Sequence, residues 1–261
     1  MLGRDEIAIS SQRHWERQVK EECGFTIPWL DLDAAVIRQY AKGELESVPA
    51  PLFQMYPANV LIDIADKNVM CLAAGGGQQS AVFGLLGAQV TVVDLAEGQL
   101  NGDKKAAAHY GYEVTTVHAD MRDLSCISNE SFDLVYQGPS MSWVPDVREV
   151  YSEVARVLKP KGLYRVDFGN PANHFMEWDG EAYRITKPYS ERVYRHEDGA
   201  FDFRHYLGDI FNGLLDEGFH IQQVEDHPWS LPDLQARPGS WSHELAYNVG
   251  FAIVARKKDA L

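Results

Sequence analysis

Between residues 69 and 168, the hydrophobic and polar positions of the chain alternate between two patterns. Short apolar runs, typical of strands buried in a parallel sheet, are separated by longer segments with apolar positions at helical spacing. The predicted strands span residues 69–73, 90–94, 113–117, 132–136 and 163–168, and the predicted helices span residues 78–87, 97–110 and 146–158. This alternation predicts a parallel sheet with right-handed crossover connections.

The segments on either side of this region follow other patterns. Two helices are predicted before it, one from Ser10 or Ser11 to Glu22 and one from Asp33 to Lys42. After Asn170 no regular pattern is evident until a helix at 204–216, which strands at 219–224 and 247–256 follow.

Together these elements predict an α/β fold with a Rossmann-like, doubly wound, mostly parallel seven-stranded sheet and helices on both faces. Residues 1–66 are expected to form an N-terminal helical cap, and residues 67–261 the main domain. Within that domain, residues 170–203 are expected to be an insertion after strand five that covers the substrate, because long irregular insertions in compact domains tend to be functional.

The strand predicted at 69–73 runs directly into Gly75-Gly76-Gly77, and Asp94 ends the next apolar run, 19 positions after Gly75. Glycines let the backbone turn sharply and approach a ligand closely, and an acid at the end of the next strand can accept hydrogen bonds from ribose hydroxyls. Asp120 and Met121 leave the third strand at the same edge of the sheet, where an acid can accept from an adenine amino group. The pattern indicates a nucleoside site.

Charge and composition narrow the function classes. The chain has 24 Lys and Arg against 38 Asp and Glu, a formal net charge of −14, which argues against a nucleic-acid substrate. No apolar stretch is long enough for a signal peptide or a membrane span, so we expect no membrane partner and a cytoplasmic location. The His, Cys, Asp and Glu residues lack the spacing of a metal site, and the three cysteines give no disulfide framework.

Residues 68–168 resemble the class I S-adenosylmethionine-dependent methyltransferases, specifically their small-molecule group. The family's first strand and turn usually read V-L-D-L-G-C-G-T-G, and this chain has V-M-C-L-A-A-G-G-G in register at 69–77. Phe132-Asp133-Leu134-Val135 is similar to the family's fourth-strand motif, and residues 157–162 to the turn before the fifth strand. The resemblance implies S-adenosylmethionine as the cofactor and transfer of its methyl group to an oxygen, nitrogen or carbon of a small molecule.

The resemblance also implies which residues bind the cofactor. Asp94 matches the residue that binds both ribose hydroxyls, and Asp120 with Met121 matches the pair at adenine. The full expected set is Ala73, Gly75, Gly77, Gln78, Asp94, Leu95, Gln99, Asp120, Met121 and Gln137. Two positions depart from the family pattern: Cys71 replaces the usual acid of the first strand, and Ala73 replaces the first glycine. Contacts to the methionine end of the cofactor must therefore come from elsewhere, and Gln78 and Gln79 are candidates.

The acceptor side is less specified by the sequence. Trp143, after the fourth strand, is expected to shape the acceptor pocket or to be a core residue, and the loop around it lacks the histidine found in many relatives. His174 is therefore our candidate for a general base. Tyr183, Arg204 and His205 are candidates for substrate binding, because the insertion mixes aromatic and arginine side chains. The same mixture also suits a covering element or a homodimer surface, and the helical cap is a further possible lid.

Two other functions remain open at this stage. A nicotinamide-dependent oxidoreductase would use the same glycine turn and Asp94. A non-catalytic protein that binds S-adenosylmethionine would explain the departures at Cys71 and Ala73 and the missing histidine.

Overall fold

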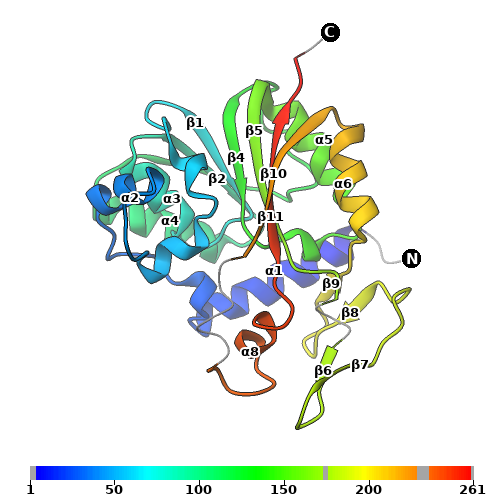
Figure 1. The fold of residues 1–261 in the computed structure, drawn as a ribbon. Helices are drawn as coiled ribbons and strands as arrows, with labels where there is room; N and C mark the ends of the chain where they lie inside the picture. Colours follow the sequence, from blue (N-terminus) through cyan, green and yellow to red (C-terminus); the bar gives the residue numbers. More distant parts are fainter. Residues whose placement is uncertain (1–3, 173–175, 228–234, 260–261) are drawn as a thin grey trace.

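A computed structural model describes residues 4–172, 176–227 and 235–259. Its centre is a seven-stranded sheet in the order β10-β11-β5-β4-β1-β2-β3 (Figure 1). The strands are β1 (Asn68–Leu72), β2 (Gln89–Asp94), β3 (Val114–His118), β4 (Phe132–Gln137), β5 (Leu158–Phe168), β10 (Phe219–Asp226) and β11 (Phe251–Lys257). Neighbouring strands from β5 to β3 are parallel, whereas β11 runs antiparallel to both β5 and β10. The predicted mostly parallel seven-stranded sheet is confirmed.

Helices cover both faces of this sheet. Successive residues of each central strand point to opposite sides, so each strand packs against helices on both faces. In β1, Met70 and Leu72 belong to one core cluster, whereas Val69 and Cys71 belong to the other. The first face is covered by α5 (Val147–Val157) and α6 (Leu207–Asp216), and the second by α2 (Ala34–Ala41), α3 (Gln79–Leu85) and α4 (Glu97–Tyr110) (Figure 1). Burial on both faces explains why the central strands read as continuous apolar runs.

The N-terminal segment extends across the lower edge of the sheet in Figure 1, beginning with α1 (Arg4–Lys20). This helix starts earlier than the predicted Ser10 or Ser11. Short 3₁₀ turns follow at Gly24–Thr26, Ala50–Gln54 and Ala58–Leu61. Glu16 of α1 accepts a hydrogen bond from the Gly98 amide at the start of α4, at 3.1 Å, where the positive end of a helix dipole favours a carboxylate.

The segment after β5 contains regular structure that its sequence did not predict. Two antiparallel hairpins form there, β6 (Met176–Trp178) with β7 (Tyr183–Ile185), and β8 (Val193–Arg195) with β9 (Phe201–Phe203). Strands of three residues are too short to show a hydrophobic period, which explains why the pattern missed them. A short helix, α8 (Trp241–Leu245), lies against the first hairpin through a 2.9 Å hydrogen bond between the Tyr183 hydroxyl and His243 Nδ1.

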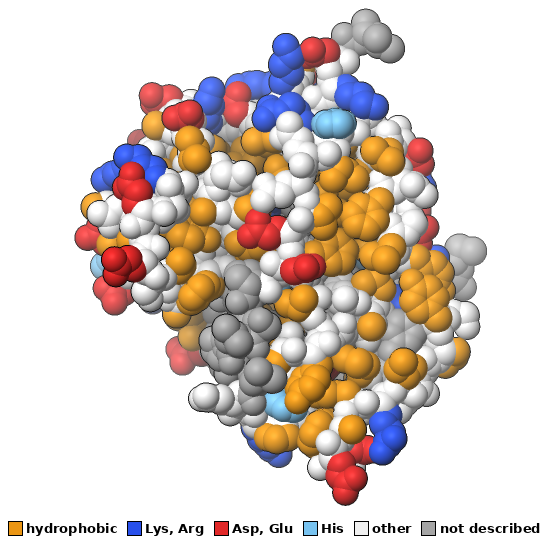
Figure 2. Space-filling view, viewed as in Figure 1, with side chains coloured by type: hydrophobic (Ala, Val, Ile, Leu, Met, Phe, Trp, Pro, Cys, Tyr) orange, Lys and Arg blue, Asp and Glu red, His pale blue; other side chains and the backbone are white. Residues whose placement is uncertain are grey.

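These hairpins carry several exposed apolar side chains, including Ile185, Tyr189, Val193 and Tyr194. Hydrophobic groups recur over the lower part of the molecule in Figure 2, where Figure 1 places the hairpins. No helix in the described ranges is long and apolar enough to cross a membrane.

A buried ion pair ties the segment before β1 to the sheet. Arg165 of β5 donates from Nη2 to Asp167 at 2.9 Å and from Nε to the Tyr56 carbonyl at 2.8 Å. The Tyr56 hydroxyl in turn donates to Asp167 at 2.6 Å, and Arg165 lies over the Tyr56 and Tyr136 rings. Each buried charge therefore has several partners, which offset the cost of removing it from water.

Candidate functional site

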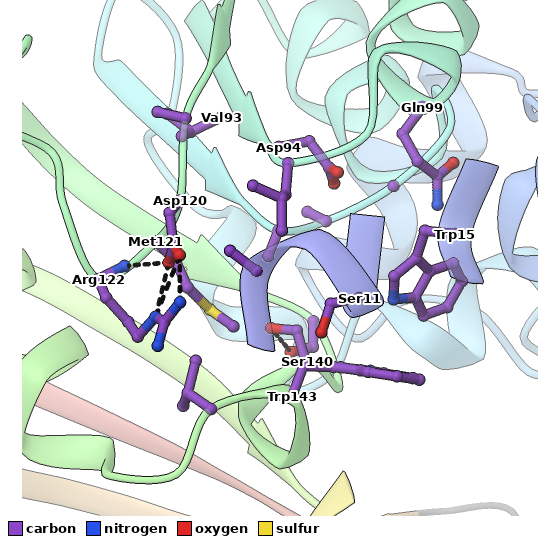
Figure 3. Close-up of a pocket in the computed structure, with 18 of the residues that line it drawn as sticks. Ser11, Trp15, Val93, Asp94, Gln99, Asp120, Met121, Arg122, Ser140 and Trp143 are labelled. Carbon is purple, nitrogen blue, oxygen red and sulfur yellow. Dashed lines mark hydrogen bonds and ion pairs between the residues drawn. The ribbon is translucent and has the colours of Figure 1, made fainter. Parts of the chain in front are cut away.

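A cavity of about 260 Å³ lies at the carboxyl ends of β1, β2, β3 and β4, with α1 across it (Figure 3). Ligands of open α/β sheets bind at this edge. From α1 and the following turn the lining residues are Ile7, Ala8, Ser11, Trp15 and Phe25. After β1 and β2 they are Ala73, Ala74, Gly75, Gln79, Val93, Asp94, Leu95 and Gln99. After β3 and β4 they are Ala119, Asp120, Met121, Arg122, Gly138, Pro139, Ser140, Trp143 and Val144.

The glycine turn after β1 is shaped by close contact with α4. Gly75, Gly76 and Gly77 all have positive φ, at 51°, 68° and 81°. A Cβ on Gly77 would lie 2.4 Å from the Gly102 carbonyl oxygen of α4. A side chain at Gly77 is therefore excluded by this contact as well as by the positive φ. On the cavity side, a Cβ on Gly75 would come within 2.9 Å of Gln99 Nε2.

Asp103, also on α4, holds the glycine turn in place through hydrogen bonds. Its Oδ1 accepts hydrogen bonds from the Gly77 amide at 2.9 Å and from the Ser80 hydroxyl at 2.5 Å. Burial raises the pKa of Asp103 to about 7, and the nearby charge of Asp94 contributes to the same shift. No local sequence pattern indicates this role of Asp103, because it depends on how α4 packs against the turn.

Asp94 ends β2 and lines the cavity (Figure 3). Its Oδ1 accepts from the Ala96 amide at 2.9 Å. Burial raises the pKa of Asp94 to about 6, although hydrogen bonds from the amides of Ala96, Gly75 and Leu95 favour its charged form. The carboxylate is therefore ionised at neutral pH and can accept hydrogen bonds from a ligand in the cavity.

Asp120 lies on the far side of Asp94 from Gln99 and Trp15 in Figure 3, and Arg122 holds it there. The Arg122 guanidinium donates to both Asp120 oxygens, with Nη2 to Oδ2 at 2.5 Å and Nε to Oδ1 at 3.0 Å, and the Arg122 amide donates to Oδ1 at 2.9 Å. The Arg122 side chain is only 2% exposed. This ion pair fixes the carboxylate beside Met121, and the sequence analysis did not identify Arg122.

Three cavity-lining side chains contain buried polar atoms without a hydrogen-bond partner in the described part of the chain: Ser11 Oγ, Gln79 Oε1 and Gln99 Oε1. Buried polar atoms are nearly always paired, so each of these atoms indicates a missing partner. With the acids, they give an otherwise apolar cavity the capacity to bind a polar ligand.

Comparison with known proteins identifies the family. Residues 70–166 match the profile of a methyltransferase domain. The sequence is also 32% identical to the uncharacterized methyltransferase YbaJ of Bacillus subtilis (strain 168) over 229 residues, which cover 82% of this chain and 88% of the relative. The chain is a class I S-adenosylmethionine-dependent methyltransferase. Its cofactor is S-adenosylmethionine.

Solved structures share the fold of this methyltransferase. An S-adenosylmethionine-dependent methyltransferase from Mesorhizobium loti has a TM-score of 0.65 at 23% identity, covering 78% of this chain and 98% of that one. The 1,6-didemethyltoxoflavin-N1-methyltransferase of Burkholderia thailandensis, with bound 1,6-didemethyltoxoflavin and S-adenosylhomocysteine, has a TM-score of 0.61 at 17% identity, covering 99% and 92%. The glycine cradle and the three unpartnered polar atoms fit a cofactor with ribose hydroxyls and a zwitterionic end.

Three of the predicted cofactor residues do not line the cavity of the methyltransferase. Gly77 faces α4. Gln78 turns away, because its Nε2 donates to the carbonyls of Gly24 at 2.7 Å and Ile27 at 2.9 Å. The Gln137 side chain accepts from the Tyr164 hydroxyl and donates to Ser140 Oγ at 2.9 Å. Gln78 and Gln137 are thus used to hold protein segments together. The other seven, Ala73, Gly75, Asp94, Leu95, Gln99, Asp120 and Met121, line the cavity.

Of the predicted acceptor-side residues, only Trp143 lines the cavity. Tyr183 packs with His243 on the first hairpin, and the Arg204 guanidinium donates to the Glu191 carbonyl. His205 is buried and bonded to the Met141 carbonyl at 2.8 Å. These three side chains are engaged within the protein and lie outside the cavity. His174 lies outside the described residues.

Proposed function

We propose that the methyltransferase acts on a small-molecule acceptor. The observation that carries this proposal is the position of α1, whose residues Ile7, Ser11 and Trp15 form one wall of the cavity. An acceptor must fit beside the cofactor beneath this helix, which suits a small molecule better than a folded protein or a nucleic acid. A net charge of −14 also disfavours a polyanionic acceptor. In this proposal residues 1–66 form the helical cap, and residues 170–203 complete the cover over the substrate.

In this proposal the nucleoside end of the cofactor binds between the ends of β2 and β3. Asp94 accepts hydrogen bonds from both ribose hydroxyls, and Gln99, with an unpartnered Oε1 beside the glycine turn, assists. Asp120 accepts from the adenine amino group, and Met121 packs against the ring. The Arg122 ion pair fixes the orientation of the Asp120 carboxylate.

Gln79 and Ser11 hold the methionine end in place of the missing first-strand acid. Cys71 cannot substitute for that acid, because burial raises the pKa of its thiol well above the usual range. Gln79 lies beside the loop after β4, with its Nε2 3.6 Å from where a Gly138 Cβ would be. An amide both donates and accepts, so Gln79 suits a group that carries an ammonium and a carboxylate.

The acceptor binds toward Trp15 and Trp143, whose rings are 5.4 Å apart and edge to face. When bound, S-adenosylmethionine supplies a methyl group on a positively charged sulfur. Aromatic faces favour a nearby cation, and the apolar wall excludes water from the reacting atoms. The protein contributes alignment of the acceptor, which accounts for much of the rate enhancement in a two-substrate transfer.

Two measurements test this function. Calorimetric titration should give binding of S-adenosylhomocysteine and no binding of NAD; the reverse result excludes the cofactor site described here. S-adenosylmethionine with a labelled methyl group is then incubated with cell extract and the enzyme. Label should enter the low-molecular-mass fraction, whereas label only in protein or nucleic acid contradicts the proposed acceptor class. Binding without any transfer favours a non-catalytic role.

A further inference from the structure

Two histidine–carboxylate pairs meet at Trp143, at the end of the cavity. His14 Nδ1 of α1 lies 2.7 Å from Asp198, and His196 Nε2 lies 3.1 Å from Asp202. The His14 ring centroid is 4.8 Å from that of Trp143, and the His196 ring stacks on Trp143 at 5.4 Å with an interplanar angle of 12°. These residues lie far apart in the sequence, so only the fold brings them together.

The His14 pair has the arrangement of an oriented general base. A carboxylate only accepts hydrogen bonds, so the proton on His14 lies on Nδ1 and its Nε2 is the basic nitrogen. The side chains of His14 and Asp198 are each only 12% exposed. Arg17, on the same helix, makes a second contact with the Asp198 carboxylate at 2.8 Å. The same geometry activates histidines in hydrolases.

Helix geometry favours His14 over the other histidines nearby. Ser11 and Trp15 of α1 line the cavity, and His14 lies between them, three residues after Ser11 and on the same side of the helix. Neither His14 nor His196 is among the cavity-lining residues, and both rings contact Trp143, which is; His14 differs in lying on the same helix face as Ser11 and Trp15. His205 is bonded to the Met141 carbonyl, and its ring is buried away from the cavity.

We propose that His14 is the general base of methyl transfer, and that the acceptor presents an O–H or N–H on a planar ring packed against Trp143. This inference rests on the proposed function. The acceptor heteroatom forms a bond to the methyl carbon while the carbon–sulfur bond breaks and its electron pair stays on sulfur. The proton of the acceptor passes to His14 Nε2 and then to water. The histidine absent from the loop after β4 is thus supplied by α1.

The charged groups around His14 come from two elements. Arg17 lies on the same helix, and Asp198, His196 and Asp202 lie on β9 and the turn before it.

The test uses the full chain, methyl-labelled S-adenosylmethionine and the low-molecular-mass fraction of a cell extract. His14→Ala should lower the rate of label transfer about 100-fold or more while S-adenosylhomocysteine affinity stays within about threefold. Added imidazole should restore part of the rate.

Two control variants distinguish a base from a structural contact. Arg17→Ala removes the other α1 contact to Asp198 and should lower the rate only slightly, without a response to imidazole. His220→Asn alters an exposed histidine of β10 and should behave as wild type. A wild-type rate in His14→Ala, or equal losses in His14→Ala and Arg17→Ala without rescue, overturns the assignment. No small-molecule labelling by the wild type overturns the proposed function itself.

Discussion

Two buried carboxylates with raised pKa values lie close together at the glycine turn. Asp94 is on its cavity side, and Asp103 is on the side of α4. Burial is the main cause of both shifts, to about 6 for Asp94 and about 7 for Asp103, and the charge of Asp94 adds to the shift of Asp103. The two acids therefore make cofactor binding and stability depend on pH in different ways.

Asp94→Asn should weaken S-adenosylhomocysteine binding about 10- to 100-fold, because charged hydrogen bonds to the ribose are lost. In the wild type, affinity should fall as the pH drops through about 6, where Asp94 gains a proton and one oxygen stops accepting. Calorimetry between pH 5 and 8 measures both effects. An affinity in the variant equal to that of the wild type would refute the ribose assignment.

Asp103 should make the protein less stable as the pH rises. Its folded pKa of about 7 exceeds the unfolded value of about 4, so between these values the folded state binds more protons and its stability falls with increasing pH. Asp103→Asn retains the oxygen that accepts from Gly77 and removes the titration. Relative to wild type, the variant should gain at least about 1 kcal/mol between pH 4.5 and 8 in urea unfolding. A difference that does not vary with pH contradicts this.

At the residue scale, the sequence predicted positions that strand ends determine and missed those that packing determines. Asp94 and Asp120 could be placed because each follows a strand at the same edge of the sheet. Ser11 and Arg122 line the cavity through the approach of α1 and an ion pair, and no local pattern shows either. Gln137 was expected just after the fourth strand but is its last residue, and its side chain is hydrogen-bonded to Tyr164 and Ser140.

Among the elements, α1 connects α4, on the cofactor-binding side of the sheet, to the second hairpin. It is bound to α4 through Glu16 and to the turn before β9 through His14 and Arg17. The sequence predicted a helix here and a cap as a possible lid, but not the first turns of the helix before Ser10 nor the residues with which it lines the cavity, which depend on contacts distant in the chain. Likewise β5 begins at Leu158 rather than 163, because Leu158 pairs with Phe132 and extends the ladder.

Ligand binding should protect α1 from hydrogen exchange. One face of the helix lines the cavity, so S-adenosylhomocysteine should restrain it. Amide exchange of residues 4–20 should slow by about tenfold or more in the complex, corresponding to about 1.4 kcal/mol of added protection. Residues 147–157 of α5, which do not line the cavity, serve as the internal control. Unchanged exchange in α1 alongside protection of residues 73–79 would remove α1 from the ligand site.

For the whole molecule, the Arg165–Asp167 pair connects the cap segment to the sheet. Asp167→Asn leaves the fully buried Arg165 charge poorly compensated, so unfolding free energy should fall by about 3–5 kcal/mol. Asp216→Asn removes an exposed ion pair with Arg148 and should change it by less than about 1 kcal/mol. Denaturant titration compares the two variants. Equal unfolding free energies in the two variants would show that breaking the buried pair has no net cost in stability.

The position of β11 determines when β10 can join the sheet and what a truncated chain would expose. Among the described strands, β10 pairs only with β11, and β11 separates it from β5. During synthesis, β1 to β5 can pair with one another before residues 251–257 exist, but β10 has no place in the sheet until they do. A chain broken before residue 251 would therefore keep every cavity-lining residue. It would nevertheless expose the long unpaired edge of β5, which would make the fragment prone to aggregation.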